Sequence, residues 1–194
     1  MRIGIAHHYG WAVAVTASSD HSVADRRRIE LIEPGLPAAP VHHEGGAHPM
    51  HRTGPVLDDA ALGALVAEVR ASVVRASIAA LDELAAALAQ TEAIASISVR
   101  AWPGDLPADI AALRRPPHES RADSVMYCEV LAEVAQARGW DVQRYDAKKV
   151  EAQAGALLGA RADDVLNGPR ARFGAPWSKD HRIALAATVI AERA

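Results

Sequence analysis

Three short runs of β-type residues lie within the first 33 positions and constrain the fold more than any other feature of the sequence. In residues 2 to 6, 11 to 17 and 26 to 33, apolar side chains take alternating positions, as they do in strands with one buried face. Only short turns separate the runs, and strands joined by short turns pair antiparallel. The opening segment therefore predicts a three-stranded antiparallel meander.

Two more strands follow, and a helix precedes each of them. An alanine-rich stretch, 58 to 90, repeats its apolar residues at spacings of three, four or their sums, which predicts a long helix with one apolar stripe. Residues 94 to 102 are typical of a buried strand, 119 to 138 of a second helix, and 140 to 146 of another strand. Because each of these strands is reached through a helix, we expect both to add in parallel to the first sheet.

The predicted helix ends carry recognisable signals. Asp58 and Asp59 suit the positive N-terminal end of the long helix, and Gly139 stops the second helix. Asp146 can cap the helix that follows it, and Ser178 can cap a last helix. The predicted order is three strands, helix, strand, helix, strand and two helices. The whole chain of 194 residues is therefore expected to form one α/β domain with a five-stranded mixed sheet.

A segment rich in proline, glycine and histidine interrupts this order at 34 to 57. It is too long for a simple connector, and loops of this length often carry function or move. Imidazole groups suit zinc, nickel or copper, but the spacing here matches no standard zinc pattern. A metal site, which Glu44 could join, is therefore the less favoured alternative to a surface loop. Its candidate ligands are His42, His43, His48 and His51.

The composition excludes several classes of protein. The net charge is −3 with nine histidines counted as neutral, so any binding to nucleic acid needs a local basic patch. The one cysteine, Cys128, rules out an intrachain disulfide, fits a reducing compartment and suits a packing role in its helix. The N-terminus lacks a signal-peptide core, and charged residues interrupt the long apolar stretches. These features predict a soluble, cytoplasmic protein without a membrane-spanning segment.

Three segments resemble the ribonuclease H-like superfamily, and in particular its Holliday-junction resolvase (RuvC-like) branch. The first is "RIGIAHHYGWAVAV", a strand, a tight turn and a second strand. The second is "LAEVAQARGWDVQRYDAKKVEAQAGALLG", a helix that ends in glycine, a strand and a lysine-bearing helix. The third, "KDHRIALAATVIA", corresponds to the final helix of the family. The resemblance implies a single ribonuclease H-like domain.

The acidic residues of that superfamily are missing from the matching positions. Its nucleases gather about four carboxylates around two divalent cations, which need oxygen ligands. The resemblance puts Ala6 on the first strand, Arg100 on the fourth, and Lys179 and Arg182 on the last helix, with Asp180 beside them. Arginine and lysine repel Mg²⁺. We therefore expect no canonical two-metal centre and predict no particular cofactor, although a divalent metal stays open as an alternative.

Replacing carboxylates by histidine, arginine and lysine side chains would reverse the charge of the pocket where these strand and helix ends meet. Such a pocket favours a phosphate, a carboxylate or the backbone of a nucleic acid. Histidine titrates near neutrality and can act as a general acid or base, and two histidines at the first turn point to opposite faces of a strand. The catalytic candidates are His7, His8, Asp180 and His181. The ligand-binding candidates are Tyr9, Arg100, Lys179 and Arg182.

Several of these residues also have a structural explanation. Arg100 could pair with a helix carboxylate such as Glu129 or Asp180. Glu119 and Asp123 share a helix face and could replace missing carboxylates, but acids in a first turn more often complement the helix dipole. Tryptophans suit core or interface anchors, and two of them could stack a base. The four are Trp11, Trp102, Trp140 and Trp177, of which the second and the fourth are the stacking candidates.

The favoured interpretation is a divergent ribonuclease H-like protein that binds nucleic acid or a phosphorylated molecule. One alternative is a hydrolase with a rebuilt site, based on His7 or His8 or on a metal in the histidine-rich loop. The other is a protein–protein interaction module, in which the helix at 58 to 90 forms a homodimer face because its small residues permit close packing.

Overall fold

The computed structural model describes residues 1–46, 54–90, 92–102 and 104–191, and its centre is a five-stranded mixed sheet in the order β3-β2-β1-β4-β5. β1 (Arg2–His7) pairs antiparallel with β2 (Trp11–Ala17), and β2 pairs antiparallel with β3 (Val23–Glu30). β4 (Ser96–Arg100) adds parallel to β1, and β5 (Asp141–Tyr145) adds parallel to β4. The predicted arrangement of three antiparallel strands and two parallel additions is confirmed.

The third strand lies earlier in the chain than the alternation at 26 to 33 predicts. It ends at Glu30, which pairs with Trp11, the first residue of β2. The partner strand therefore decides where β3 stops, and the apolar residues that follow do not belong to the sheet. Within β3, Arg26 and Arg28 share one face and Arg27 lies on the other.

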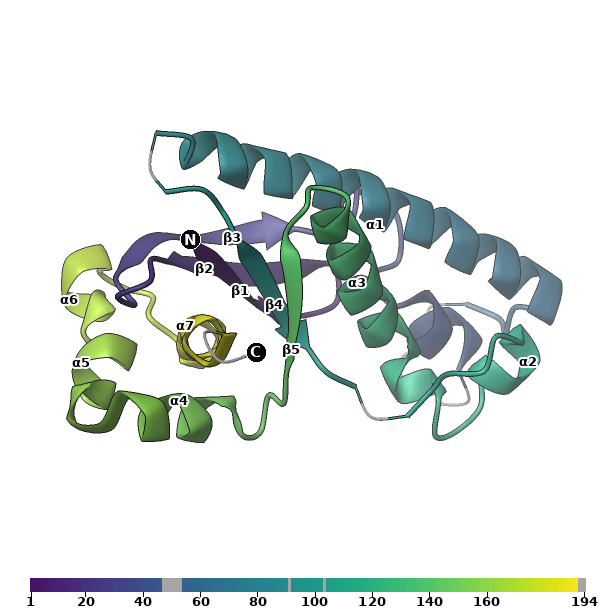
Figure 1. The fold of residues 1–194 in the computed structure, drawn as a ribbon. Helices are drawn as coiled ribbons and strands as arrows, with labels where there is room; N and C mark the ends of the chain where they lie inside the picture. Colours follow the sequence, from purple (N-terminus) through teal and green to yellow (C-terminus); the bar gives the residue numbers. More distant parts are fainter. Residues whose placement is uncertain (47–53, 91, 103, 192–194) are drawn as a thin grey trace.

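Helices cover both faces of the sheet (Figure 1). α1 (Asp59–Ala87) and α3 (Glu119–Gln136) lie on one face, and α7 (Lys179–Ile190) lies on the other. Short helices accompany α7 on its side: α4 (Val150–Leu158), the 3₁₀ turn η3 (Gly159–Arg161), α5 (Ala162–Leu166) and α6 (Pro169–Phe173). The short helix α2 (Ile110–Leu113) follows the strand β4.

The long helix α1 has the single buried stripe that its periodicity predicts. The stripe includes Leu62, Val69, Val73, Leu81 and Leu84. Asp58 caps the helix, because its Oδ1 accepts the Ala61 N–H at 2.7 Å. No helix in the described part of the chain is long and apolar enough to cross a membrane. A homodimer through the outer face of α1 stays a prediction, which sedimentation velocity would test.

The segment at 34 to 57 is more regular than its composition predicts. Pro40–Gly45 form a π-helical turn, η1, that packs on α3. The backbone N–H groups of Val41 and His42 donate to the two carboxylate oxygens of Asp123 at 3.1 and 2.9 Å. The prediction of a plain loop was wrong here, because the acceptor that orders the turn lies 82 residues beyond Val41 in the chain.

α7 approaches β1 more closely than any side chain between them would allow. A Cβ atom on Gly4 would lie 1.8 Å from the carbonyl oxygen of Ala184, so only glycine fits at this position. The face of α7 toward the sheet continues with the small residues Ala186 and Ala187. Ser98 of β4 donates its hydroxyl to the Ala187 carbonyl at 3.1 Å. This close packing holds the start of α7 beside the end of β1.

We predict that Gly4→Ala lowers the free energy of unfolding by about 1–3 kcal/mol or more, because overpacking a tight contact costs this much and the clash is with backbone. Gly63→Ala is the matched control. Gly63 lies inside α1, and an added Cβ there meets nothing within 4 Å. This control should gain about 0.5–1 kcal/mol from helix propensity. Urea denaturation measures both values, and equal stability of Gly4→Ala and the wild type would contradict the packing of α7 on β1.

Candidate functional site

The turn between β1 and β2 sends three consecutive side chains to three different places. His7 faces α3, where its Nδ1 lies 3.5 Å from the Sγ of Cys128. His8 faces α7, and its Nε2–H donates to the Oδ2 of Asp180 at 3.1 Å. Tyr9 donates its hydroxyl to a backbone carbonyl in the first turn of α3 at 3.4 Å. The two histidines lie on opposite faces of the sheet, as strand alternation predicts.

The contact between His8 and Asp180 joins residues that are 172 positions apart in the chain. Both side chains reach solvent, with 43% and 30% of their surface exposed. Because Nε2–H donates to the carboxylate, Nδ1 is left to accept a proton. The imidazole also stacks on the ring of Trp11, with the centroids 4.2 Å apart, and the guanidinium of Arg28 lies 4.1 Å from the same ring. These contacts give His8 one orientation at the edge of the sheet.

A cleft of about 430 Å³ lies beside this pair, between β2, β3 and the start of α7. Arg26 is fixed in its wall, because its guanidinium donates to the carbonyl oxygens of Pro176 and Phe173. Arg28 pairs with Glu30 at 2.7 Å and remains 56% exposed. The cleft therefore combines guanidinium groups with an aromatic ring, a lining that suits an anion. Its polar and aromatic lining comprises Trp11, Arg26, Arg28, Ser178, Asp180 and His181.

The positions at the ends of β1 and β4 that face α7 hold a methyl group and a guanidinium group. Gly4 and Ser98 contact α7. Because side chains two positions apart on a strand share a face, Ala6 and Arg100 also lie on the face of the sheet toward α7. The guanidinium carbon of Arg100 lies 3.9 Å from the ring centroid of Trp102. The ion pair with Glu129 or Asp180 that the sequence left open does not occur among the described residues. A cation–π contact holds Arg100 in its place.

The other candidates on α7 have different surroundings. Lys179 is exposed and makes no ion pair within the residues described. His181 is buried, and its Nδ1 accepts the N–H of the N-cap serine at 3.2 Å; burial lowers the pKa of this imidazole. Arg182 donates to Glu151 of α4 at 3.1 Å. His181 thus completes the N-terminal cap of α7 and Arg182 ties α7 to α4, whereas Lys179 and Asp180 present their side chains at the surface.

On the α3 side of the sheet, the half-buried His7 and the buried Cys128 form an uncharged pair. Burial, with repulsion from Arg100 and His8, lowers the pKa of His7 to about 4. Burial raises the pKa of Cys128 to about 11. Both groups are therefore neutral at pH 7, and the thiol is not an activated nucleophile. No base is near Cys128 in sequence, and the fold brings His7 to it from 121 residues away.

The carboxylates of Glu119 and Asp123 lie on α3, away from the edge that faces α7. Their exposed fractions are 1% and 2%. Burial raises the pKa of Asp123 to about 6, although the hydrogen bonds from the η1 backbone favour its ionised form. Neither carboxylate lies beside α7, so the structure does not support the less favoured alternative in which they replace missing acids.

The histidine-rich segment lies near Tyr9 and not near the His8–Asp180 pair. His42 and His43 have ring centroids 5.3 Å apart, and the Tyr9 ring is 6.4 and 6.0 Å from them. The other two predicted metal ligands, His48 and His51, lie outside the described residues. Across residues 1–46, 54–90, 92–102 and 104–191, no group of three histidine, cysteine or acidic side chains is arranged to hold a metal ion.

Sequence reasoning missed three residues of the cleft, namely Trp11, Arg26 and Arg28. Strand alternation could have indicated these residues, because it puts Arg26 and Arg28 of the third strand on one face. Which face meets α7 is decided only when the helix packs. Trp177, a stacking candidate, is instead buried and donates its Nε1–H to the Leu166 carbonyl at 2.8 Å.

Comparison with known proteins supports the fold. The sequence matches no family model and no curated protein sequence. Among solved structures, RuvC from T. thermophilus, in complex with a Holliday junction substrate, is similar with a TM-score of 0.52. The match covers 97% of this chain and 89% of that chain at 12% sequence identity. This chain has a ribonuclease H-like fold. The ribonuclease H-like arrangement places the ends of β1 and β4 and the start of α7 at one edge, where Ala6, Arg100 and Lys179 lie.

We predict that His7→Gln and Asp123→Asn change the pH dependence of stability in opposite directions. The pKa of His7 lies below its ordinary value of 6.5, so acidification from about pH 6.5 to 4 destabilises the folded state, by up to about 3 kcal/mol. The pKa of Asp123 lies above its ordinary value of 3.8, so a rise from about pH 4 to 6 costs a similar amount.

In the wild type these two effects oppose each other. Without the His7 imidazole, the free energy of unfolding should fall more steeply as the pH rises from 4 to 6. Without the Asp123 carboxylate, it should rise more steeply over the same range. Urea denaturation in steps of half a pH unit measures both curves, and curves parallel to that of the wild type would show that neither group titrates abnormally.

Proposed function

We propose that this protein binds nucleic-acid phosphates at the α7-facing edge of its sheet, without the two-metal centre of ribonuclease H-like nucleases. The observation that carries the proposal is the presence of Ala6 and Arg100 at the α7-facing ends of β1 and β4. Lys179 adds a second cation at the first position of α7. Together they make an edge that attracts anions.

The residues at this edge do not fit a pair of divalent cations. Magnesium and calcium take oxygen ligands, which the methyl group of Ala6 does not offer. The side chains of Arg100 and Lys179 carry only donors and a positive charge, which repels a cation. The carboxylate of Asp180 is engaged by His8 at 3.1 Å. We therefore derive no metal-dependent step at this edge.

A phosphate backbone suits the distribution of the cations. Arg100 comes from β4 and Lys179 from α7, so these two positive groups are spread along the edge and do not surround one small ion. Arg28 of β3 is paired with Glu30 and adds little net charge. The similar fold of T. thermophilus RuvC is described with a Holliday junction substrate. Because His8 and Arg28 already contact the ring of Trp11, phosphate contacts should outweigh base stacking. We therefore expect weak sequence preference.

The combined variant Arg100→Gln, Lys179→Gln tests this function. Fluorescence anisotropy with a labelled single strand and a four-way junction measures Kd across a series of salt concentrations. Removing two phosphate contacts should reduce the salt slope for the single strand by about 1.4 and weaken binding at low salt at least tenfold. EDTA should leave the affinity unchanged.

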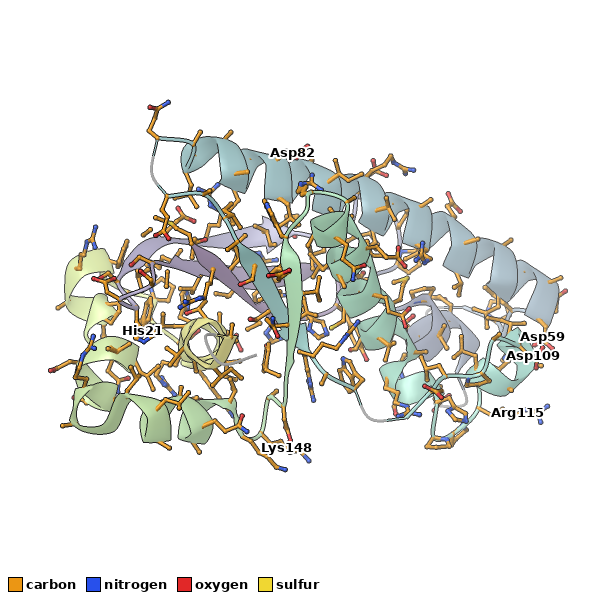
Figure 2. The ribbon with its side chains drawn as sticks, viewed as in Figure 1. His21, Asp59, Asp82, Asp109, Arg115 and Lys148 are labelled. Carbon is orange, nitrogen blue, oxygen red and sulfur yellow. The ribbon has the colours of Figure 1, made fainter. Side chains whose placement is uncertain are left out.

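Arg115→Gln provides the control for charge alone, because Arg115 lies near α2, at the far end of the molecule from α7 (Figure 2). Its Kd should match that of the wild type. The proposal fails if the wild type binds neither probe, or if the double variant keeps the salt slope of the wild type.

The hydrogen bond between His8 and Asp180 favours a second candidate, metal-independent hydrolysis of a phosphodiester or ester. Asp180 would hold the imidazole and stabilise its protonated form, while Nδ1 of His8 takes a proton from water. This function uses the same cleft, and the cations beside it would neutralise the charge of the substrate.

Hydrolysis of bis(p-nitrophenyl) phosphate and of p-nitrophenyl acetate in EDTA tests this candidate. We expect His8→Gln to lower kcat at least 100-fold, as the loss of a general base does, and Asp180→Asn to lower it at least tenfold. His43→Gln, in η1, should leave the rate unchanged. Wild-type rates equal to the buffer rate, or full activity in His8→Gln, would remove this function.

A further inference from the structure

A second cavity, of about 540 Å³, lies on the other face of the sheet from α7. It is bounded by α3, by the N-terminal part of α1 at Val66 and Arg70, and by residues 101–102 and 104–107 after β4. Figure 1 shows α1 and α3 on this side of the sheet. Volumes of this size are typical of sites for small molecules. α3 and α7 pack on opposite faces of the sheet, and the cavity meets the proposed nucleic-acid edge at Trp102, whose ring contacts Arg100. Binding in the cavity does not depend on the nucleic-acid function.

One part of the cavity wall is apolar and includes Val66, Leu106, Leu113, Val125 and Met126. The thiol of Cys128 is part of the wall, with His7 behind it. This neutral pair adds no charge to the interior at pH 7, so the cavity suits a ligand with an apolar body.

Charged groups of both signs line the same cavity. Arg70 is neutralised by Glu133, at 2.7 Å, and contributes little net charge. Three carboxylates, those of Asp105, Asp123 and Glu129, line it together with the guanidinium of Arg144. Asp123 accepts the backbone N–H groups of η1, whereas Arg144 and Glu129 make no ion pair within the described part of the chain. A ligand that carries one negative and one positive group would pair with Arg144 and Glu129, whereas a simple anion would be repelled by the carboxylates and a simple cation by Arg144.

We propose that this cavity binds a small zwitterion with an apolar side chain, such as a free apolar α-amino acid. The ligand carboxylate would pair with Arg144, whose planar guanidinium can bind a carboxylate through two hydrogen bonds. The ligand ammonium would pair with Glu129. The side chain would pack against Met126 and its apolar neighbours, removing their surface from water.

Isothermal titration calorimetry with L-phenylalanine tests the site, and two analogues separate the charges. 3-Phenylpropanoate lacks the amine, and phenethylamine lacks the carboxylate. We expect saturable binding of L-phenylalanine to the wild type and at least tenfold weaker binding of either analogue. Equal affinity for all three, or no binding of L-phenylalanine at 10 mM, would overturn the proposal.

Two substitutions assign the partners within the cavity. Arg144→Gln and Glu129→Gln should each weaken the binding of L-phenylalanine at least tenfold, and both residues are exposed enough to be replaced without loss of the fold. Arg170→Gln, on α6, is the matched control and should keep the wild-type Kd. Unchanged binding in both cavity variants would mean that the ligand binds elsewhere.

Methylthiolation of the single cysteine, which forms a mixed disulfide and releases methanesulfinate, gives a second readout on the chain without substitutions. Cys128 lies in the cavity wall, so bound L-phenylalanine should slow its reaction with methyl methanethiosulfonate at least threefold. The same rate with and without saturating ligand would contradict binding in this cavity.

Discussion

The contact between Gly4 of β1 and the Ala184 carbonyl of α7 sets the geometry of the whole sheet edge. No Cβ fits between the two backbones, so the helix lies directly on the strand. Asp180 is one helical turn before Ala184, and this places its carboxylate beside His8 at the end of the same strand. The position of the cleft, of Lys179 and of the His8–Asp180 pair therefore depends on a glycine that takes no part in their chemistry.

The end of β1 and the three-residue turn that follows it separate two different electrostatic environments. On the α7 side, His8 meets a carboxylate, exposed cations and solvent. On the α3 side, His7 meets a buried thiol and stays uncharged at neutral pH, because burial lowers its pKa to about 4. Adjacent residues of one type thus acquire different properties from the two helical layers. One face holds a solvent-exposed hydrogen bond to a carboxylate, and the other holds a neutral pair beside a cavity.

Basic groups at the α7-facing edge of a ribonuclease H-like sheet would change what that edge can bind. In such a fold the ends of β1 and β4 and the start of the last helix converge whatever side chains they carry. With carboxylates, that convergence gathers divalent cations. With Ala6, Arg100 and Lys179, it favours phosphate directly. This is the physical basis of our proposal that nucleic-acid binding here is independent of metal ions.

The strands, the helices that connect them and the residues of the first turn were predictable from the amino-acid sequence alone. The strands and helices follow from local periodicity and capping residues, and the antiparallel pairing follows from short connections. Alternation also indicated that His7 and His8 face opposite ways. Only the tertiary structure decided the partners of these residues. Cys128 lies 121 positions from His7, Asp180 lies 172 positions from His8, and Asp123 orders a π-helical turn that composition alone describes as a loop. Such pairings depend on how helices pack across a sheet, and no local pattern in a single chain records which distant side chain will meet a given residue.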